Sequence, residues 1–272
     1  MKKRTKIIAT LGPSSTNGNK IEKMLHSGAD VFRINLSHTS IHDAKKIVSL
    51  VRDREKKVGR PVAIMLDLQG QKVRIKGFTK KSYINLKSGD NFILNPALKN
   101  NGSQKQVGIT YKDLYKNVNV GDELLLSDAL IKLRVDRVHA KKVYTTVDRG
   151  GKLKTYQGLN KKGGGLSLSG ITSKDKTDLK ESLGLEYDYI AVSFVKDERD
   201  IQEIKKIIKN KDIRIIAKIE RNEAIENIDK ITKVSDGLLV ARGDLGVEIG
   251  IEQLPAAQKF LIRKAISADK IA

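Results

Sequence analysis

The 272-residue sequence contains no cysteine and no tryptophan, and aromatic residues make up only 4% of it. The absence of cysteine excludes disulfides, thiolate metal sites and cysteine nucleophiles, and it is compatible with a reducing cytoplasm. No apolar run approaches the roughly 18 residues of a membrane span. The basic start of the chain precedes an apolar stretch that is too short for a signal peptide. We therefore expect a cytoplasmic protein with no membrane partner and a mainly aliphatic core.

Hydrophobic residues make up 39% of the sequence and charged residues 31%. This balance supports a buried core and argues against a disordered chain. The length suits one large domain or two domains of ordinary size.

The formal net charge is +21, and it is unevenly distributed. Residues 72–165 hold 20 Lys and Arg against 7 Asp and Glu, whereas residues 166–272 hold 19 of each. The lysines are scattered through Asn- and Gly-rich loops, whereas a nucleic-acid-binding protein would gather them in an Arg-rich or aromatic-laced stripe. We expect no nucleic-acid partner. A solvated lysine surface and binding of small anionic substrates both explain the charge.

The first 70 residues alternate between strand and helix patterns. Short apolar runs predict buried strands at 6–11, 29–36 and 61–68, and apolar spacing predicts helices at 19–28 and 42–58. Strands that are buried on both faces and separated by helices are typical of a parallel sheet in an α/β fold.

The helical pattern stops at Gly70. Short β-like segments separated by turn residues follow, at 83–86, 91–94, 123–126, 131–135 and 142–147. We interpret residues 71–165 as a small all-β domain inserted in the α/β chain. The α/β part is then divided into residues 1–70 and 166–272.

The α/β pattern resumes after the insert. Helices are predicted at 174–183, 198–208, 224–231 and 253–266, and strands at 189–195, 214–219 and 237–242. The chain then has six β/α units, with a seventh strand starting at 270–272. Without the 95 residues of the insert only 177 remain, whereas an eight-unit barrel usually needs about 250. Either an open six-stranded sheet or a barrel cut short fits this count.

Polar residues gather at the predicted strand ends, where barrel enzymes carry their functional side chains. They are Arg33, Asn35, Ser37, His38, Asp67, Ser193, Lys218, Glu220, Arg242 and Asp244. Singly, each has a structural explanation, such as an Arg33–Asp67 ion pair. Together they combine carboxylates suited to Mg²⁺ with cations suited to phosphate, which is the mixture that phosphoryl transfer needs.

Seven segments along nearly the whole chain carry more specific motifs. They are Thr5–Ser15, Phe32–His38, Leu66–Gly70, Leu126–Ile131, Thr172–Lys176, Ala217–Glu220 and Ser235–Glu248. These segments closely resemble the pyruvate kinase family. The resemblance implies an α/β fold with an incomplete TIM-type (β/α)8 barrel of about six units and an inserted small all-β lid domain. It also implies phosphoryl transfer from phosphoenolpyruvate to ADP, giving pyruvate and ATP in the last step of glycolysis.

The resemblance assigns roles in binding the metal and the substrate. Glu220 and Asp244 bind Mg²⁺ or Mn²⁺, and the catalytic residues Lys218 and Arg33 contact the transferring phosphoryl group from two sides. The backbone N–H groups of Gly243 and Asp244 hold the substrate carboxylate, in a position that also suits an anion on general grounds.

The resemblance further implies a monovalent-cation corner made of Asn35, Ser37 and Asp67, with Arg33, Asn35 and His38 toward the nucleotide.

The hinge into the insert departs from the family members that need K⁺. Those members have Thr and Glu where this chain has Leu68 and Lys72. Leu68 removes an oxygen ligand from the cation corner, and the Lys72 ammonium is a compact monovalent cation. We predict that Lys72 replaces K⁺, so K⁺ is not required. The structural alternative is a Lys72 side chain that points into solvent.

The chain also departs from the family pattern in the insert and in its C-terminal part. Gln157 stands where the family has a nucleotide-phosphate lysine, and Lys161 or Lys162 is a candidate substitute. The sequence lacks counterparts of strands seven and eight and of the family's C-terminal domain. We expect the isolated chain to be nearly inactive and the complete form to be a homo-oligomer. The alternative is a truncated or degenerate relative that binds phosphorylated metabolites or a partner without catalysis.

Overall fold

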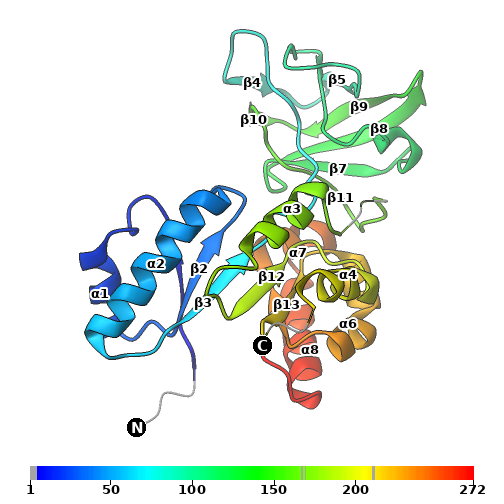
Figure 1. Cartoon of the computed structure of the whole chain (residues 1–272). Coiled ribbons are helices and arrows are strands. Elements are labelled where there is room, and N and C mark those ends of the chain that lie inside the picture. Colours follow the sequence, from blue (N-terminus) through cyan, green and yellow to red (C-terminus); the bar gives the residue numbers. More distant parts are fainter. Residues whose placement is uncertain (1–4, 167, 169, 210–211) are drawn as a thin grey trace.

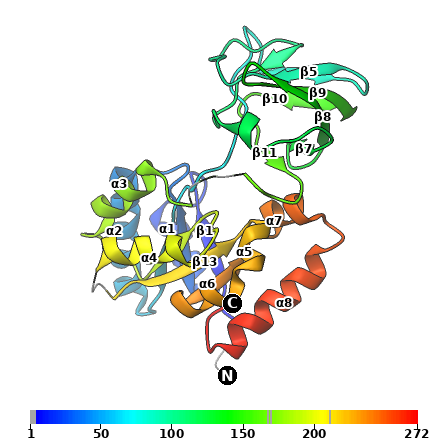
Figure 2. The same cartoon turned by 90° about the vertical axis from the view of Figure 1, so that its right-hand side faces the viewer.

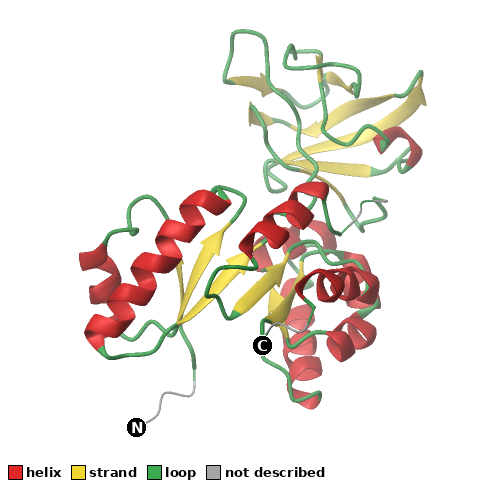
Figure 3. Cartoon of the chain, in the orientation of Figure 1, coloured by secondary structure: helices red, strands yellow, loops and turns green. Residues whose placement is uncertain are grey.

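The computed structural model describes residues 5–166, 168, 170–209 and 212–272. These residues form two bodies, which Figure 1 shows one above the other. The lower body is a parallel sheet with helices, and the upper body is built from short, mostly antiparallel strands. All eight α-helices of the described residues belong to the lower body, and the short helix that Figure 3 shows in the upper body is the 3-10 helix η1 Leu114–Lys116.

The main sheet has six strands in the order β1-β2-β3-β12-β13-β14, and every neighbouring pair is parallel. The strands are β1 Ile8–Leu11, β2 Val31–Asn35, β3 Ala63–Asp67, β12 Tyr189–Val192, β13 Arg214–Ile219 and β14 Gly237–Val240. Beyond β14, Ile271 forms a parallel bridge with Gly237. This bridge lies where the sequence predicts the start of a seventh strand.

The helices connect these strands. They are α1 Gly18–His26, α2 Ile41–Val58, α3 Ser173–Ser182, α4 Glu198–Ile208, α5 Asn222–Glu226, α6 Ile228–Val234, α7 Arg242–Ile249 and α8 Leu254–Ser267. The single helix predicted over 224–231 is wrong, because the helix breaks at Asn227 and forms α5 and α6. The Asn227 side chain donates to the backbone oxygen of Glu223 at 3.0 Å, a local bond that competes with regular helix.

Most of the insert is one six-stranded sheet in the order β11-β7-β8-β9-β5-β6, and a second sheet pairs β10 with β4. The elements are β4 Tyr83–Leu86, β5 Asn91–Leu94, β6 Gln106–Val107, η1 Leu114–Lys116, β7 Glu123–Leu126, β8 Ile131–His139, β9 Lys142–Arg149, β10 Gly151–Lys154 and β11 Leu159–Lys161. The five predicted segments are strands, and β6, β10 and β11 were not predicted.

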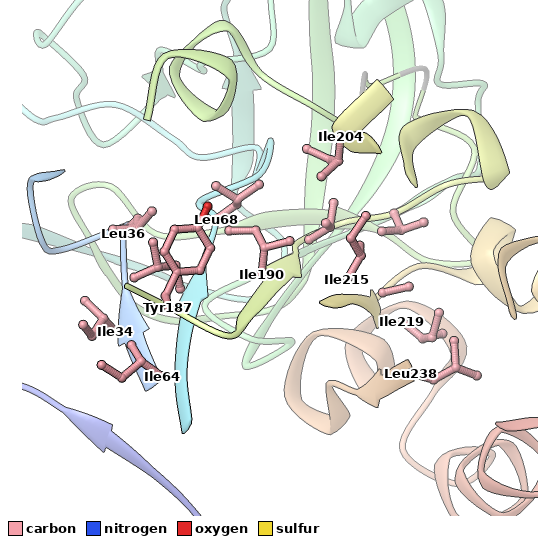
Figure 4. Close-up of a cluster of buried hydrophobic side chains, with 14 of the residues drawn as sticks. Ile34, Leu36, Ile64, Leu68, Tyr187, Ile190, Ile204, Ile215, Ile219 and Leu238 are labelled. Atoms are coloured by element: carbon pink, nitrogen blue, oxygen red, sulfur yellow. The ribbon is translucent and has the colours of Figure 1, made fainter. Parts of the chain in front are cut away.

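Each body has its own hydrophobic core. In the lower body, aliphatic side chains from the strands meet those of the helices, and Figure 4 shows the neighbouring strand residues Ile190 and Ile215 with the helix residue Ile204 nearby. The insert has a separate cluster that includes Phe92. The aliphatic core predicted from the composition is present in both bodies.

The opposite face of the main sheet buries a much smaller cluster of Met65, Ala191 and Ile216. Side chains two residues apart on a strand point to the same face. The residues that follow these three on that face are therefore Asp67, Ser193 and Lys218, and this step places polar groups at the carboxyl ends of the strands.

The architecture confirms a parallel α/β sheet that is consistent with an incomplete barrel. The division at 70/71 and 165/166 stays a prediction. Across the described ranges, we find no helix with the length and apolar character needed to cross a membrane.

Candidate active site

A cleft of about 430 Å³ lies at the carboxyl ends of the strands. The main sheet and its loops contribute polar side chains, and the insert contributes three residues. The lining residues are Arg33, Asn35, Ser37, His38, Leu68, Gln69, Lys72, Arg74, Tyr156, Ser193, Phe194, Lys218, Glu220 and Asp244. The cleft therefore collects most of the strand-end residues that the sequence singled out.

Lys218 is at the centre of the polar network. Its ammonium lies 3.0 Å from a Glu220 oxygen and 3.3 Å from an Asp67 oxygen, and it donates to the Ser193 hydroxyl at 2.7 Å. The side chains of Lys218, Asp67 and Glu220 are 11%, 1% and 3% exposed, so the pairs are largely shielded from water. Because the ammonium contacts two carboxylates and a hydroxyl, its position is closely defined.

Burial sets the protonation of this network. Burial by itself lowers the pKa of Lys218, but Glu220 and Asp67 outweigh it and raise the pKa above its ordinary value. Burial raises the pKa of Glu220, and the Lys218 ammonium offsets only part of this effect. Lys218 therefore stays positively charged at neutral pH.

Arg33 forms the other side of the network. Its guanidinium contacts one Asp67 oxygen through Nε at 2.6 Å and Nη2 at 2.5 Å, and Nη1 donates to Thr10 at 3.0 Å. Asp67 thus lies between Arg33 and Lys218, and it holds two cations at one strand end. Two cations beside a polar cleft favour an anionic ligand.

Asp244 lies in the first turn of α7, which begins at Arg242 and is separated from β14 by Ala241 alone. One of its oxygens contacts the Lys72 ammonium at 2.5 Å, and Lys72 also lies 3.9 Å from Asp128 of the insert. Gly243 lines a neighbouring cleft of about 620 Å³ between α7 and the insert. The first-turn N–H groups have no partner within their own helix, so they are available to an anion.

Glu220 and Asp244 are the carboxylates that fit a divalent metal. Both line the cleft, and the negative charge of Asp244 contributes to the raised pKa of Glu220, so the two face a common region. Among the described residues, no group of three His, Asp or Glu side chains is gathered for a metal. Two carboxylates nevertheless suit Mg²⁺, which keeps several waters and binds through one or two carboxylates plus substrate oxygens.

The remaining predicted residues are arranged as follows. Asn35, Ser37 and His38 line the cleft, and the Asn35 side chain accepts from the Ser37 backbone at 3.0 Å. Lys72 does not point into solvent, since its side chain is 21% exposed and pairs with Asp244.

The two candidate substitutes for Gln157 lie within the insert. Lys161 pairs with Asp122 at 2.9 Å, and Lys162 pairs with Glu123 at 3.1 Å. Neither lysine is among the described residues that line the cleft.

The sequence reasoning missed several cleft residues. Arg74 and Tyr156 come from the insert and are linked by a 3.1 Å bond from Arg74 to the Tyr156 backbone oxygen. Phe194 has a left-handed backbone, with φ of 54°, and its N–H donates to Glu220 at 2.6 Å. A non-glycine residue at positive φ is uncommon, and no sequence motif predicts this conformation at Phe194. The position of Arg74, two residues after Lys72, is only a weak indication in the sequence that it lines the cleft.

The fold is a parallel α/β sheet consistent with an incomplete barrel, and its strand-end cleft is lined by both cationic and carboxylate side chains. The chain belongs to the pyruvate kinase family, since the family model described as "Pyruvate kinase, barrel domain" matches residues 2–272. It is 44% identical over 269 residues to pyruvate kinase II of Salmonella typhimurium and 44% identical over 276 residues to a pyruvate kinase of Buchnera aphidicola.

These alignments cover nearly all of the chain but little more than half of each relative. They include 97% and 99% of this chain, against 56% and 57% of the relatives. A pyruvate kinase of Haemophilus influenzae gives the same picture, at 42% identity over 97% of the chain and 56% of the relative.

Proposed function

We propose that this chain carries the phosphoryl-transfer site of a pyruvate kinase, which converts phosphoenolpyruvate and ADP to pyruvate and ATP in cytoplasmic glycolysis. One observation carries the proposal. Lys218 is held between Glu220 and Asp67 in the same cleft as Arg33 and Asp244. Phosphoryl transfer depends mainly on positioning and charge neutralisation, and this cleft offers both.

The cations act on the phosphoryl group. The Lys218 ammonium neutralises charge that develops on its oxygens, and Arg33 contacts the phosphate from the other side of Asp67. The backbone N–H groups of Gly243 and Asp244 bind the substrate carboxylate at the start of α7. Because Asp67 and Ser193 fix Lys218, its charge is in place before the reaction begins.

Glu220 and Asp244 would hold Mg²⁺ or Mn²⁺. When bound, the metal ion would neutralise negative charge on the substrate oxygens. In the structure the Lys72 ammonium contacts Asp244, so Lys72 partly neutralises that carboxylate. His38 and Asn35, at the edge of the cleft, would face the nucleotide together with Arg33.

The insert would act as a lid over the cleft. Lys72, Arg74 and Tyr156 of the insert already line it. Closing the insert would exclude water, so that the phosphoryl group passes to ADP and not to solvent.

We also propose that the enzyme does not need K⁺. Lys72 lines the cleft with Asn35 and Ser37, although its ion pairs are with Asp244 and Asp128 and the predicted corner residue Asp67 pairs with Arg33 and Lys218. A permanent ammonium beside the substrate would supply the charge that K⁺ supplies elsewhere in the family.

Further proposals concern partners. The complete enzyme would be a homo-oligomer, and it would bind neither nucleic acid nor membranes. The scattered placement of the lysines in the sequence supports the absence of nucleic-acid binding.

The test is pyruvate formation from phosphoenolpyruvate by the purified complete enzyme, since we expect the isolated chain to be nearly inactive. We expect it to require both ADP and Mg²⁺, and we expect Glu220→Gln to raise the Mg²⁺ concentration needed for half-maximal rate. A complete enzyme that binds phosphoenolpyruvate and Mg²⁺ but forms no pyruvate would contradict the proposal.

A further inference from the structure

The chain returns from the insert to the main sheet through residues 159–166, here called the return segment. Its first three residues form β11, which pairs with β7 of the insert and contacts α7. The segment then passes α7 and α5 (Figure 2). Gly163, Gly164 and Gly165 are consecutive and all have left-handed backbones, with φ of 79°, 78° and 86°. Glycine adopts such angles without steric cost but loses much conformational freedom on ordering. The segment therefore needs contacts that fix its path.

Glu223 of α5 supplies one set of these contacts. Its carboxylate accepts from the Gly165 N–H at 2.9 Å and from Arg221 at 2.8 Å, while Arg221 donates to the Leu166 backbone oxygen at 2.7 Å. The approach is close, because a Cβ on Gly164 would lie 3.0 Å from a Glu223 oxygen. Glu223 and Arg221 thus bind the C-terminal end of the glycine run.

Glu248 of α7 supplies the other set. Its carboxylate accepts from the Asn160 side chain in β11 and from the Asn222 N–H at 3.1 Å, and its backbone oxygen accepts from Gly163 at 2.9 Å. Glu248 is only 7% exposed. It therefore links the return segment to both α7 and the start of α5.

Both acids lie close in sequence to a carboxylate of the cleft. Glu223 follows Glu220 by three residues, and Glu248 follows Asp244 by four residues on the same face of α7. In the part of the chain that the structure describes, the residues lining the cleft include neither Glu223 nor Glu248. A movement of the return segment would therefore be transmitted to α5 and α7 without direct contact with a ligand.

We propose that Glu223 and Glu248 form a two-point clamp on the return segment that sets the position of the insert relative to the cleft carboxylates. Both are positioning residues. The proposal concerns how the insert is held, so it does not depend on the reaction proposed above.

Hydrogen exchange of single backbone amides tests the clamp on the whole chain. The Gly165 amide reports on Glu223, and the Asn222 amide reports on Glu248. We expect Glu223→Ala and Glu248→Ala each to accelerate exchange at both amides by about tenfold or more, because losing a hydrogen bond to a carboxyl group that is partly shielded from water costs about this much. Glu223→Gln keeps an acceptor oxygen and should restore much of the protection. Glu181→Gln, at an exposed acid on α3, should change neither amide.

The cross-effect decides between a clamp and independent local bonds. Acceleration confined to the amide next to each substitution would overturn the clamp, and so would unchanged exchange at Gly165 in Glu223→Ala. If the alanine variants do not fold, Glu223→Gln and Glu248→Gln are compared at the same two amides, where a smaller shared acceleration supports the clamp and none overturns it.

The KM for ADP is measured separately. If it is unchanged while exchange accelerates at both amides, the clamp stands and the proposed lid role fails.

Discussion

Glu248 carries a proton at a higher pH than an ordinary carboxyl group, because burial raises its pKa from 4.5 to about 7. The folded state then binds more protons than the unfolded state between these values. The contribution of Glu248 to the free energy of unfolding is fully present below pH 4.5, and it is lost as the pH rises to about 7. The pH range that matters follows directly from this shift.

Glu248→Gln removes that titration and should flatten the pH dependence. We expect the variant to gain stability relative to the parent as the pH rises, reaching about 3 kcal/mol at pH 8. Denaturant unfolding of both proteins at pH 5 and pH 8 measures the difference. The same stability difference at both pH values would mean that Glu248 does not titrate in this range.

Lys72 is the residue on which the K⁺ prediction depends. Its ammonium contacts Asp244 at 2.5 Å, so Lys72→Glu places two carboxylates together. With Leu68→Thr restoring an oxygen ligand, we expect the double variant to need K⁺ for activity, whereas Lys81→Glu at an exposed position should not. Turnover is measured with and without K⁺ at constant ionic strength and with Mg²⁺ present. Strong K⁺ activation of the unmodified enzyme would refute the role of Lys72.

Gly70, which follows β3 at the hinge into the insert, links element geometry to the cleft. Its φ is 66°, and an added Cβ would lie 2.7 Å from the Ser193 Cβ and 3.1 Å from the Ser193 backbone oxygen. Because Ser193 holds Lys218, Gly70→Ala should lower both stability and turnover.

We expect Gly70→Ala to cost roughly 3 kcal/mol, the sum of a left-handed alanine and a steric overlap. Gly59→Ala is the matched control, since Gly59 has φ of 68° with nothing within 4 Å of the added Cβ. It should cost about 1 kcal/mol. Thermal or denaturant unfolding gives both values, and equal costs would show that the approach to Ser193 is unimportant.

At the level of elements, the sequence predicted what depends on local pattern. The helix over 198–208 was predicted with its observed bounds, and Arg214–Ile219 was predicted as a strand. β11 was missed, because its three residues become a strand only through pairing with β7. β8 extends to His139, four residues beyond its predicted end, because it pairs with β9 across a bulge.

Some features of the cleft could likewise be predicted from the sequence, and others could not. Strand alternation places Asp67, Ser193 and Lys218 on one face, so the residues could be named from the sequence. The Lys72–Asp244 pair joins positions 172 residues apart and needs the folded structure. The left-handed Phe194 also depends on its surroundings, since its N–H is fixed by Glu220.

The whole molecule has two separate hydrophobic cores. Leu133 is fully buried in the insert and Ile64 is fully buried in the main body. Each replacement by alanine should cost about 2–5 kcal/mol, but it should act mainly on its own body. Hydrogen exchange after Leu133→Ala should accelerate in β7–β9 and leave β3 and β12 nearly unchanged, with the reverse after Ile64→Ala. Uniform acceleration would mean that the two bodies unfold as one unit.

The central claim is that Lys218, held by Asp67, Glu220 and Ser193, neutralises the transferring phosphoryl group. The most direct measurement is turnover of phosphoenolpyruvate and ADP by the active enzyme carrying Lys218→Met, with Lys206→Met on the exposed side of α4 as the control. We predict a loss of about 10³-fold or more for Lys218→Met, with phosphoenolpyruvate binding retained through the α7 amides and the control unaffected. Near-normal turnover in Lys218→Met would contradict the account.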